Sequence, residues 1–323
     1  LSRRSFENEC KIAIVSRVNS TGIPQQGMPV WEELVNKSKS LYSNRIGLVF
    51  VGPAVVLLLL SIVFPLGYAS QLSFFEGKTF IGFGNYIRAF RDKEVWQALG
   101  HTVYFTFFSV VAHLIIGLAL ALLLNSVTKG RTFFRIALLI PWMVAPVVTA
   151  TTWKWMLNEQ YGIINYLMMQ VGLIDSPIPW LSSIELALPA VTVANIWMRF
   201  PYVMLMLYSG LQGIPDDLYE AAEVDGANAV QRFFSITLPS LSFIIILTTI
   251  LDTVYAFRLF DLSNIMTNGG PINASEVLSL YVYRQAFQNL NFNYSSAVAM
   301  IMFLITFVFS LVYIKLMNMN REN

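Results

Sequence analysis

Two charged residues of opposite sign, Arg199 and Asp252, stand within long apolar stretches of the sequence. A charge at membrane depth is costly, so such residues usually pair with each other, contact a partner or face a polar pathway. The pair could therefore hold helices together or line a route for a solute, and both interpretations stay open. Asn195 adds a hydrogen-bonding group to the candidate route, whereas His113 is interpreted as a helix-packing donor rather than a proton relay.

Aromatic residues in the same stretches could form the walls of that route, because sugars stack on aromatic faces and hydrogen bond through their hydroxyl groups. The candidates are Trp142, Trp153, Trp197, Tyr202 and Tyr255. Each of them could equally be a core or interface residue. In or near these stretches, basic Arg199, Lys154 and Arg258 outnumber Asp252, which favours an acidic sugar, although Lys154 and Arg258 could extend to the membrane surface instead.

A polar segment between two apolar stretches, residues 214–227, carries acidic groups in a helical pattern. Pro215 suits the first turn of a helix, Asp216 favours the positive end of its dipole, and Gly226 can adopt the left-handed conformation that ends it. Helices that rest on lipid headgroups are normally basic, so an acidic helix favours docking into a basic groove of a protein partner. The candidate docking residues are Pro215, Leu218, Tyr219, Glu220, Ala221, Ala222, Asp225 and Gly226.

The composition indicates that these residues are positioned by a membrane protein. Of 323 residues, 56% are hydrophobic and only 12% are charged, with a mean hydropathy of +0.59. Soluble domains carry roughly 25% charged residues, so a soluble enzyme is excluded, and the 14% of aromatic residues argue against disorder. A net charge of +2 without a basic stripe argues against nucleic acid, and one cysteine with two histidines has no metal-ligand spacing.

Six apolar stretches are long enough to cross about 30 Å of hydrocarbon as helices. They cover residues 47–68, 102–125, 134–157, 186–211, 238–260 and 296–317. Their apolar runs do not alternate with polar residues as barrel strands would. The sequence therefore predicts an all-α fold, a six-span helical membrane protein.

The positions of the basic residues predict that both termini lie in the cytoplasm. We expect a cytoplasmic tail at 1–46, a six-span domain at 47–317 with its cytoplasmic loop at 212–237, and a cytoplasmic end at 318–323. The loop before Thr102 departs from this pattern, because Lys78, Arg88, Arg91 and Lys93 fall on the predicted outer side.

A nucleotide site of the chain's own is not expected. The P-loop pattern GxxxxGK[ST] is represented only by Gly77-Lys78-Thr79, and Leu72 stands where its first glycine is required. No arrangement of Ser, Cys or His indicates a nucleophile either. We therefore expect that the chain is not an enzyme.

The residues around the acidic segment resemble a known family. Glu220-Ala221-Ala222, three residues, Gly226, nine residues and then Ile236-Thr237-Leu238-Pro239 are similar to the signature of permease subunits of binding-protein-dependent ABC importers. The surrounding sequence resembles the carbohydrate branch related to the maltose permeases, as do Gly84-Asn85-Tyr86 and the segment from Thr267 to Pro271. The resemblance covers nearly all of the chain from Leu48 onward.

The resemblance implies a type I importer in the bacterial inner membrane that moves a carbohydrate at the expense of ATP. Its partners would be a second permease subunit, two cytoplasmic ATPase subunits that bind ATP and Mg²⁺, and an extracytoplasmic solute-binding protein, with lipid around the spans. The helix at 215–226 would lie in a cleft of an ATPase subunit, with Glu220 accepting from a basic group. A proton- or ion-coupled secondary transporter and a non-transporting membrane scaffold are the alternatives.

Overall fold

The computed structural model describes residues 44–322, and side chains from 51 to 315. The predicted tail at 1–46 lies outside the described residues except for its last three positions. The chain divides into two compact units, residues 1–67 and 68–323. In the described part of the first unit, α3 (Asn44–Leu58) and the π-helical turn η2 (Leu59–Val63) lead into α4 (Phe64–Ser73).

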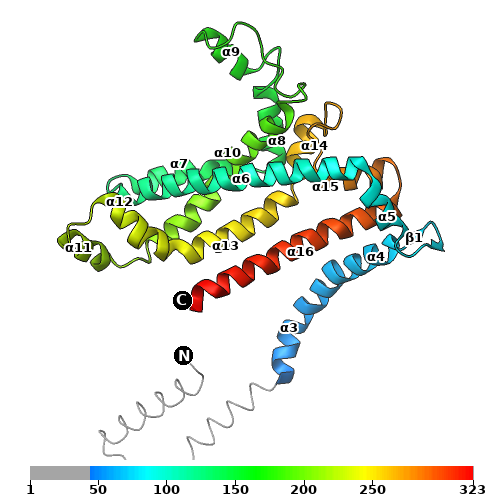
Figure 1. The fold of residues 1–323 in the computed structure, drawn as a ribbon, viewed down its shortest axis with the longest axis horizontal. Helices are drawn as coiled ribbons and strands as arrows, with labels where there is room; N and C mark the ends of the chain where they lie inside the picture. The colour runs from blue at the N-terminus through cyan, green and yellow to red at the C-terminus, as the bar shows by residue number, and fades with distance from the viewer. Residues whose placement is uncertain (1–43, 323) are drawn as a thin grey trace, which may run out of the picture. The chain divides into compact units, whose positions relative to one another are not determined.

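The second unit is almost entirely helical (Figure 1). Its one two-stranded hairpin, within the described residues, pairs β1 and β2 antiparallel with Phe75 opposite Phe80. The elements in chain order are β1 (Phe75–Glu76), β2 (Thr79–Phe80), α5 (Gly84–Arg91), α6 (Lys93–Ser126), α7 (Arg131–Met143), α8 (Pro146–Met156), α9 (Ile163–Gln170), α10 (Ala187–Leu211), α11 (Asp216–Val224), α12 (Ala229–Arg232), η3 (Phe233–Thr237), α13 (Leu238–Phe257), α14 (Asp261–Thr267), α15 (Leu278–Tyr283), η4 (Arg284–Gln288) and α16 (Phe292–Glu322).

Five helical segments among the described residues are long and apolar enough to cross a membrane. They are Val51–Ser73, Lys93–Ser126, Ala187–Leu211, Ala229–Phe257 and Phe292–Lys315. The prediction of an all-α membrane protein is confirmed. The orientation with both termini in the cytoplasm stays a prediction.

The predicted third span, over 134–157, is not one continuous helix. The chain forms α7 and α8 instead, which meet at an angle of 90°. Ala145 between them is extended, with φ −59° and ψ 139°, because a residue before proline is driven out of the helical region. Pro146 then begins α8, where its missing N–H costs nothing. The two helices complete a sixth span only if the bent pair crosses as one.

Close contacts between α6, α10 and α13 form the centre of the second unit. Gly117 of α6 lies directly against Val203 and Met204 of α10, where a Cβ atom would come within 2.9 Å of the Val203 side chain. Gly210 of α10 lies in the same way against Leu241 of α13. Small residues let helix backbones approach closely in a membrane, where packing rather than water drives association.

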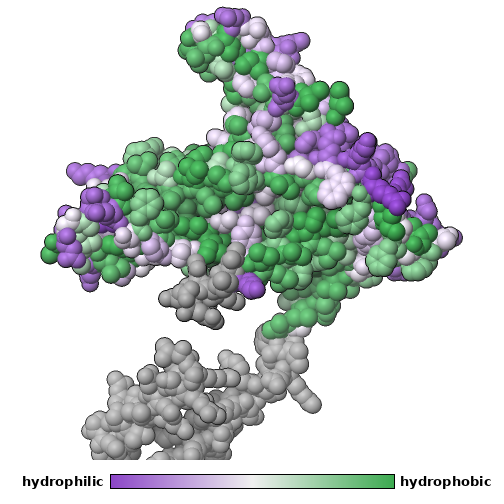
Figure 2. All heavy atoms as spheres, viewed as in Figure 1, coloured by the Kyte–Doolittle hydropathy of each residue, from purple (hydrophilic) through white to green (hydrophobic). Residues whose placement is uncertain are grey.

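Hydrophobic side chains cover the outside of the second unit between two polar ends (Figure 2). Phe107 and Ile115 of α6 and Phe307 of α16 are among the exposed apolar residues of the second unit. Hydrophilic residues gather around α11 at one end and around α14 and α15 at the other. An apolar surface of this extent is stable in contact with lipid rather than with water.

Candidate functional site

Helix α11 is the acidic helix that the sequence predicts over 215–226. Pro215 is its N-cap residue, one position before the helix begins, and Asp216 and Asp217 occupy the first turn. Gly226 ends it in the left-handed region with φ 80°, and the N–H of Ala227 donates to the carbonyl of Ala222 at 2.9 Å. The helix is therefore short and closed at both ends by local residues.

No residue of α11 is buried in the chain. Glu220, Ala221 and Asp225 are exposed, and Tyr219 and Ala222 are half-buried. Leu218 is exposed by 47% and Val224 by 88%. The helix therefore presents carboxylates together with apolar side chains on the surface of the chain.

Two side-chain contacts connect α11 to the segment that leads into α13. The Tyr219 hydroxyl lies 3.0 Å from Oγ1 of Thr237, and Arg232 donates to Glu223 at 2.9 Å. Asn228 begins α12 with a capping box that it forms with Gln231. A force applied to α11 would therefore be transmitted to the start of α13.

A buried ionic cluster joins α6, α10 and α13. Asp252 is 1% exposed and accepts from Nδ1 of His113 at 2.7 Å and from Nε of Arg199 at 3.2 Å. One of the two sequence interpretations paired Arg199 with Asp252. The structure adds His113 of α6, which contacts α13 through Asp252 and α10 through the carbonyl of Asn195, 3.4 Å from its Nε2. The feature of the sequence that pointed to this contact is a single histidine, His113, inside an apolar stretch.

The guanidinium of Arg199 lies between two aromatic rings. Its central carbon is 4.2 Å from the centre of the Tyr202 ring and 3.9 Å from that of Tyr255. Cation–π contacts of this kind strengthen when water is excluded. Among the described residues, Nε forms the only hydrogen bond of this guanidinium, so its two terminal nitrogens can donate to a solute.

The remaining route candidates lie in separate contacts. Trp153 and Trp197 pack edge to face with 6.1 Å between ring centres, and Trp142 packs on Tyr202 at 5.8 Å. Asn195 is fully buried, and neither its Oδ1 nor its Nδ2 has a hydrogen-bond partner among the described residues. Sequence reasoning placed Asn195 here but could not find this unsatisfied amide.

The two other basic residues counted as positive charges near the spans each donate a hydrogen bond to a backbone carbonyl. Lys154 donates from Nζ to the carbonyl of Ile265 at 2.9 Å, and Arg258 donates to that of Val254 at 3.3 Å. Asp252 already balances Arg199, so a simple excess of positive charge does not describe this region. In the part of the chain that the structure describes, no three side chains of the Asp, Glu, His or Cys types could hold a metal ion together.

Comparison with known proteins places the chain among membrane subunits of transporters. Residues 53–318 match the family of binding-protein-dependent transport system inner membrane components. The trehalose/maltose transport system permease protein MalF of Thermococcus litoralis is 36% identical over 285 residues, covering 86% of this chain and 95% of that protein. The sulfoquinovosyl glycerol transport system permease protein SmoG of Agrobacterium fabrum is 33% identical over 301 residues, covering 91% and 96%.

A solved structure shares the fold. The crystal structure of a bacterial ABC transporter involved in the import of the acidic polysaccharide alginate contains a chain that superposes with a TM-score of 0.77, at 21% identity, over 90% of this chain and 98% of that one. The family match spans most of the chain, and the relatives agree along nearly their whole length. The chain therefore belongs to the binding-protein-dependent transport system inner membrane components, the multi-pass permease subunits of ABC transporters.

Proposed function

We propose that this chain is one of two permease subunits of an ATP-driven carbohydrate importer in the inner membrane. The names of the relatives support the substrate class, since the Thermococcus litoralis protein is a trehalose/maltose permease and the Agrobacterium fabrum protein is a sulfoquinovosyl glycerol permease. A second permease subunit, two ATPase subunits that bind ATP and Mg²⁺, and a solute-binding protein outside the membrane complete the assembly. Family membership favours this function over a secondary transporter or a scaffold.

The observation that carries the proposal is the exposed, two-capped acidic helix α11. Its carboxylates and apolar side chains fit a cleft with basic and apolar groups on an ATPase subunit, and Glu220 is the exposed carboxylate nearest the middle of the helix. Because Tyr219 contacts Thr237 and Glu223 contacts Arg232, both in the segment that leads into α13, movement of the ATPase would pull on α13. That helix carries Asp252, so the pull would reach the buried cluster with Arg199.

For the solute itself, we propose that Arg199 takes part in recognising an acidic saccharide. Stacking between Tyr202 and Tyr255 and the bond to Asp252 fix the guanidinium, while its terminal nitrogens remain available. A carboxylate or sulfonate can accept two parallel hydrogen bonds from a guanidinium, which a single hydroxyl cannot. Arg199→Gln should therefore reduce uptake of an acidic saccharide much more than uptake of its neutral counterpart. Equal losses would contradict this role.

Charge reversal on α11 tests the coupling. The importer carrying Glu220→Lys should reach the membrane but lose ATP-dependent uptake, and the ATPase subunits should no longer co-purify with it. Glu185→Lys is the matched control, since this exposed glutamate lies in the loop before α10 on the side predicted to face outward. Wild-type uptake and normal co-purification by the Glu220→Lys importer would refute the proposed function.

A further inference from the structure

Helix α5 presents two opposite faces. Asn85 and Ala89 are buried, and Ala89 joins a core cluster with Tyr281 of α15 and Tyr294 of α16. The amide of Asn85 donates to the carbonyls of Ser73 and Phe75 at 3.0 and 2.8 Å. The helix is thus attached firmly along one side, and what the other side contacts is set by its exposed residues.

The exposed side of α5 is apolar and aromatic. Phe83 is exposed by 67%, Ile87 by 53% and Phe90 by 58%, at the spacing of one helix face. Trp96, exposed by 53%, packs on Phe90 at 6.2 Å and donates from Nε1 to the carbonyl of Phe90 at 2.8 Å. Such residues in water would be costly, whereas tryptophan and phenylalanine are favoured where hydrocarbon meets the headgroups.

The length of α6 indicates that α5 lies where the hydrocarbon meets the headgroups. Its 34 residues span about 51 Å at 1.5 Å per residue, well beyond about 30 Å of hydrocarbon. The first turn of α6 carries Lys93 and Glu94, whereas its last turns are apolar up to Leu124, so the excess length lies at its start, which follows α5 directly. The first turns of α6 therefore lie at the membrane surface. An amphipathic helix attached there has its apolar face in contact with acyl chains.

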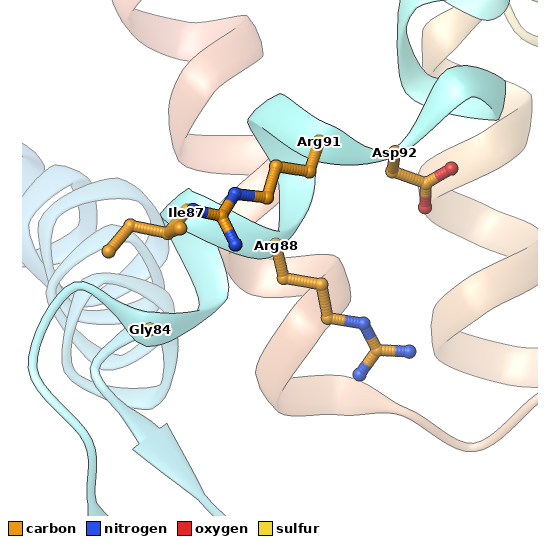
Figure 3. Close-up of a pocket in the computed structure, with 5 residues that line it drawn as sticks. All are labelled: Gly84, Ile87, Arg88, Arg91 and Asp92. Carbon is orange, nitrogen blue, oxygen red and sulfur yellow. The ribbon is translucent and has the colours of Figure 1, made fainter.

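Arg88 and Arg91 stand on the flank of α5, between the apolar face and the buried face. They line a surface cavity of about 510 Å³ together with Gly84, Ile87 and Asp92 (Figure 3). Both arginines are exposed, and neither guanidinium forms a hydrogen bond or ion pair with any residue in the described range. The guanidinium of Arg88 lies over the Tyr294 ring at 4.4 Å, which fixes its position.

Asp92, the acidic residue of the cavity, is occupied by other partners. Its Oδ2 accepts from the hydroxyls of Tyr281 and Tyr294 at 2.8 and 2.6 Å, and its Oδ1 accepts from the N–H of Glu94 at 2.9 Å. These hydrogen bonds orient the carboxylate of Asp92 toward the two tyrosines. Two guanidinium groups consequently face the cavity without a carboxylate bonded to either of them, next to an apolar surface.

We propose that this cavity binds an anionic phospholipid, with its phosphodiester between Arg88 and Arg91 and an acyl chain along Phe83, Ile87 and Phe90. Guanidinium groups are strong donors to phosphate oxygens. The adjoining apolar face distinguishes a lipid from free phosphate, which would leave that face unpaired. The site also accounts for Arg88 and Arg91, two of the four basic residues that depart from the charge pattern of the predicted outer loops.

Native mass spectrometry of the detergent-purified full chain with added dioleoyl phosphatidylglycerol tests the site. Wild-type protein should retain this lipid better than dioleoyl phosphatidylcholine. Each arginine near a membrane surface contributes about 1 kcal/mol of attraction, so Arg91→Gln should weaken retention about fivefold and the Arg88→Gln/Arg91→Gln double variant about 25-fold. Arg91 has no polar contact to lose, so the single variant keeps the test valid if the double variant folds poorly.

The matched control is Lys78→Gln/Lys93→Gln, which removes two exposed charges of the same loop that do not line the cavity. It should retain phosphatidylglycerol as the wild type does. A tenfold excess of inorganic phosphate should not displace the lipid. The proposal fails if the arginine variants retain phosphatidylglycerol as well as the control does, whether or not they weaken docking of the binding protein. It also fails if inorganic phosphate displaces phosphatidylglycerol.

Discussion

Replacing Asp252 with alanine removes the anion on which three helices converge. Asp252 is 1% exposed and is bonded to His113 and Arg199, and the Arg199 side chain is only 13% exposed. Removing one partner of a buried ion pair leaves the other charge without compensation, which costs about 3–5 kcal/mol. At roughly 2–4 °C per kcal/mol for a domain of this size, D252A should lower the unfolding temperature by about 6 °C or more.

A double variant distinguishes the destabilisation caused by an unpaired Arg199 charge from the destabilisation caused by lost packing at position 252. R199M/D252L removes both members of the pair and replaces them with apolar side chains, which is often neutral when a buried pair is exchanged as a whole. It should recover at least half of the stability that D252A loses. Tryptophan fluorescence during heating of the purified full chain measures both variants.

Two results would refute this reasoning. If D252A unfolds at the wild-type temperature, the carboxylate does not hold the three helices together. If R199M/D252L is as unstable as D252A, the loss comes from packing at position 252 rather than from a stranded guanidinium. Neither measurement depends on transport, so the test of the cluster stands apart from the proposed function.

Two further predictions concern the core and the polar cluster at Asp92. Gly117→Val should destabilise the chain by about 1–3 kcal/mol, because the new side chain would overlap Val203 and the backbone of Met204. Gly100→Ala on the same helix has open space around the new methyl group and should stabilise the chain slightly. Thermal unfolding measures both variants. Burial raises the pKa of Asp92, but hydrogen bonds from Tyr294, Tyr281 and the N–H of Glu94, with the charge of Arg88, outweigh burial and hold the pKa below its ordinary value of 3.8. This carboxylate therefore contributes stability that is present above pH 3.8 and is lost as the pH falls through its lowered pKa. Unfolding curves below pH 4 should show that loss in the wild type and a smaller one in D92N, and identical pH dependence would contradict it.

The acidic helix could be predicted closely because its determinants are local. Pro215 fixes its start, the first-turn aspartates match its dipole, and Gly226 takes a left-handed conformation that other residues adopt at a cost. Interactions within one turn depend only on neighbouring residues. Its docking role stays a prediction, because the partner is a property of the assembly.

The break between α7 and α8 shows the limit of that local reasoning. Pro141 and Pro146 both stand in the predicted third span, yet Pro141 lies within α7 and only Pro146 stands at the break, where it begins α8. A proline inside a helix removes one backbone hydrogen bond, whereas a proline in the first turn removes none, and surrounding packing decides which of the two positions a proline takes. The two prolines therefore predict that this segment can bend, but they do not predict at which residue it bends.

The sequence by itself determined that this chain is helical, resides in a membrane and carries a short acidic helix between its fourth and fifth apolar stretches, Asp216–Val224, because hydropathy and capping act over short stretches. Only the tertiary structure decided that His113 meets Asp252 across 139 positions, that Arg199 lies between two tyrosine rings, and that Asp92 is bonded to tyrosines rather than to its neighbouring arginines. These pairings depend on the rotation of each helix about its axis. That rotation is set by close contacts such as Gly117 against Val203, which no single helix specifies alone.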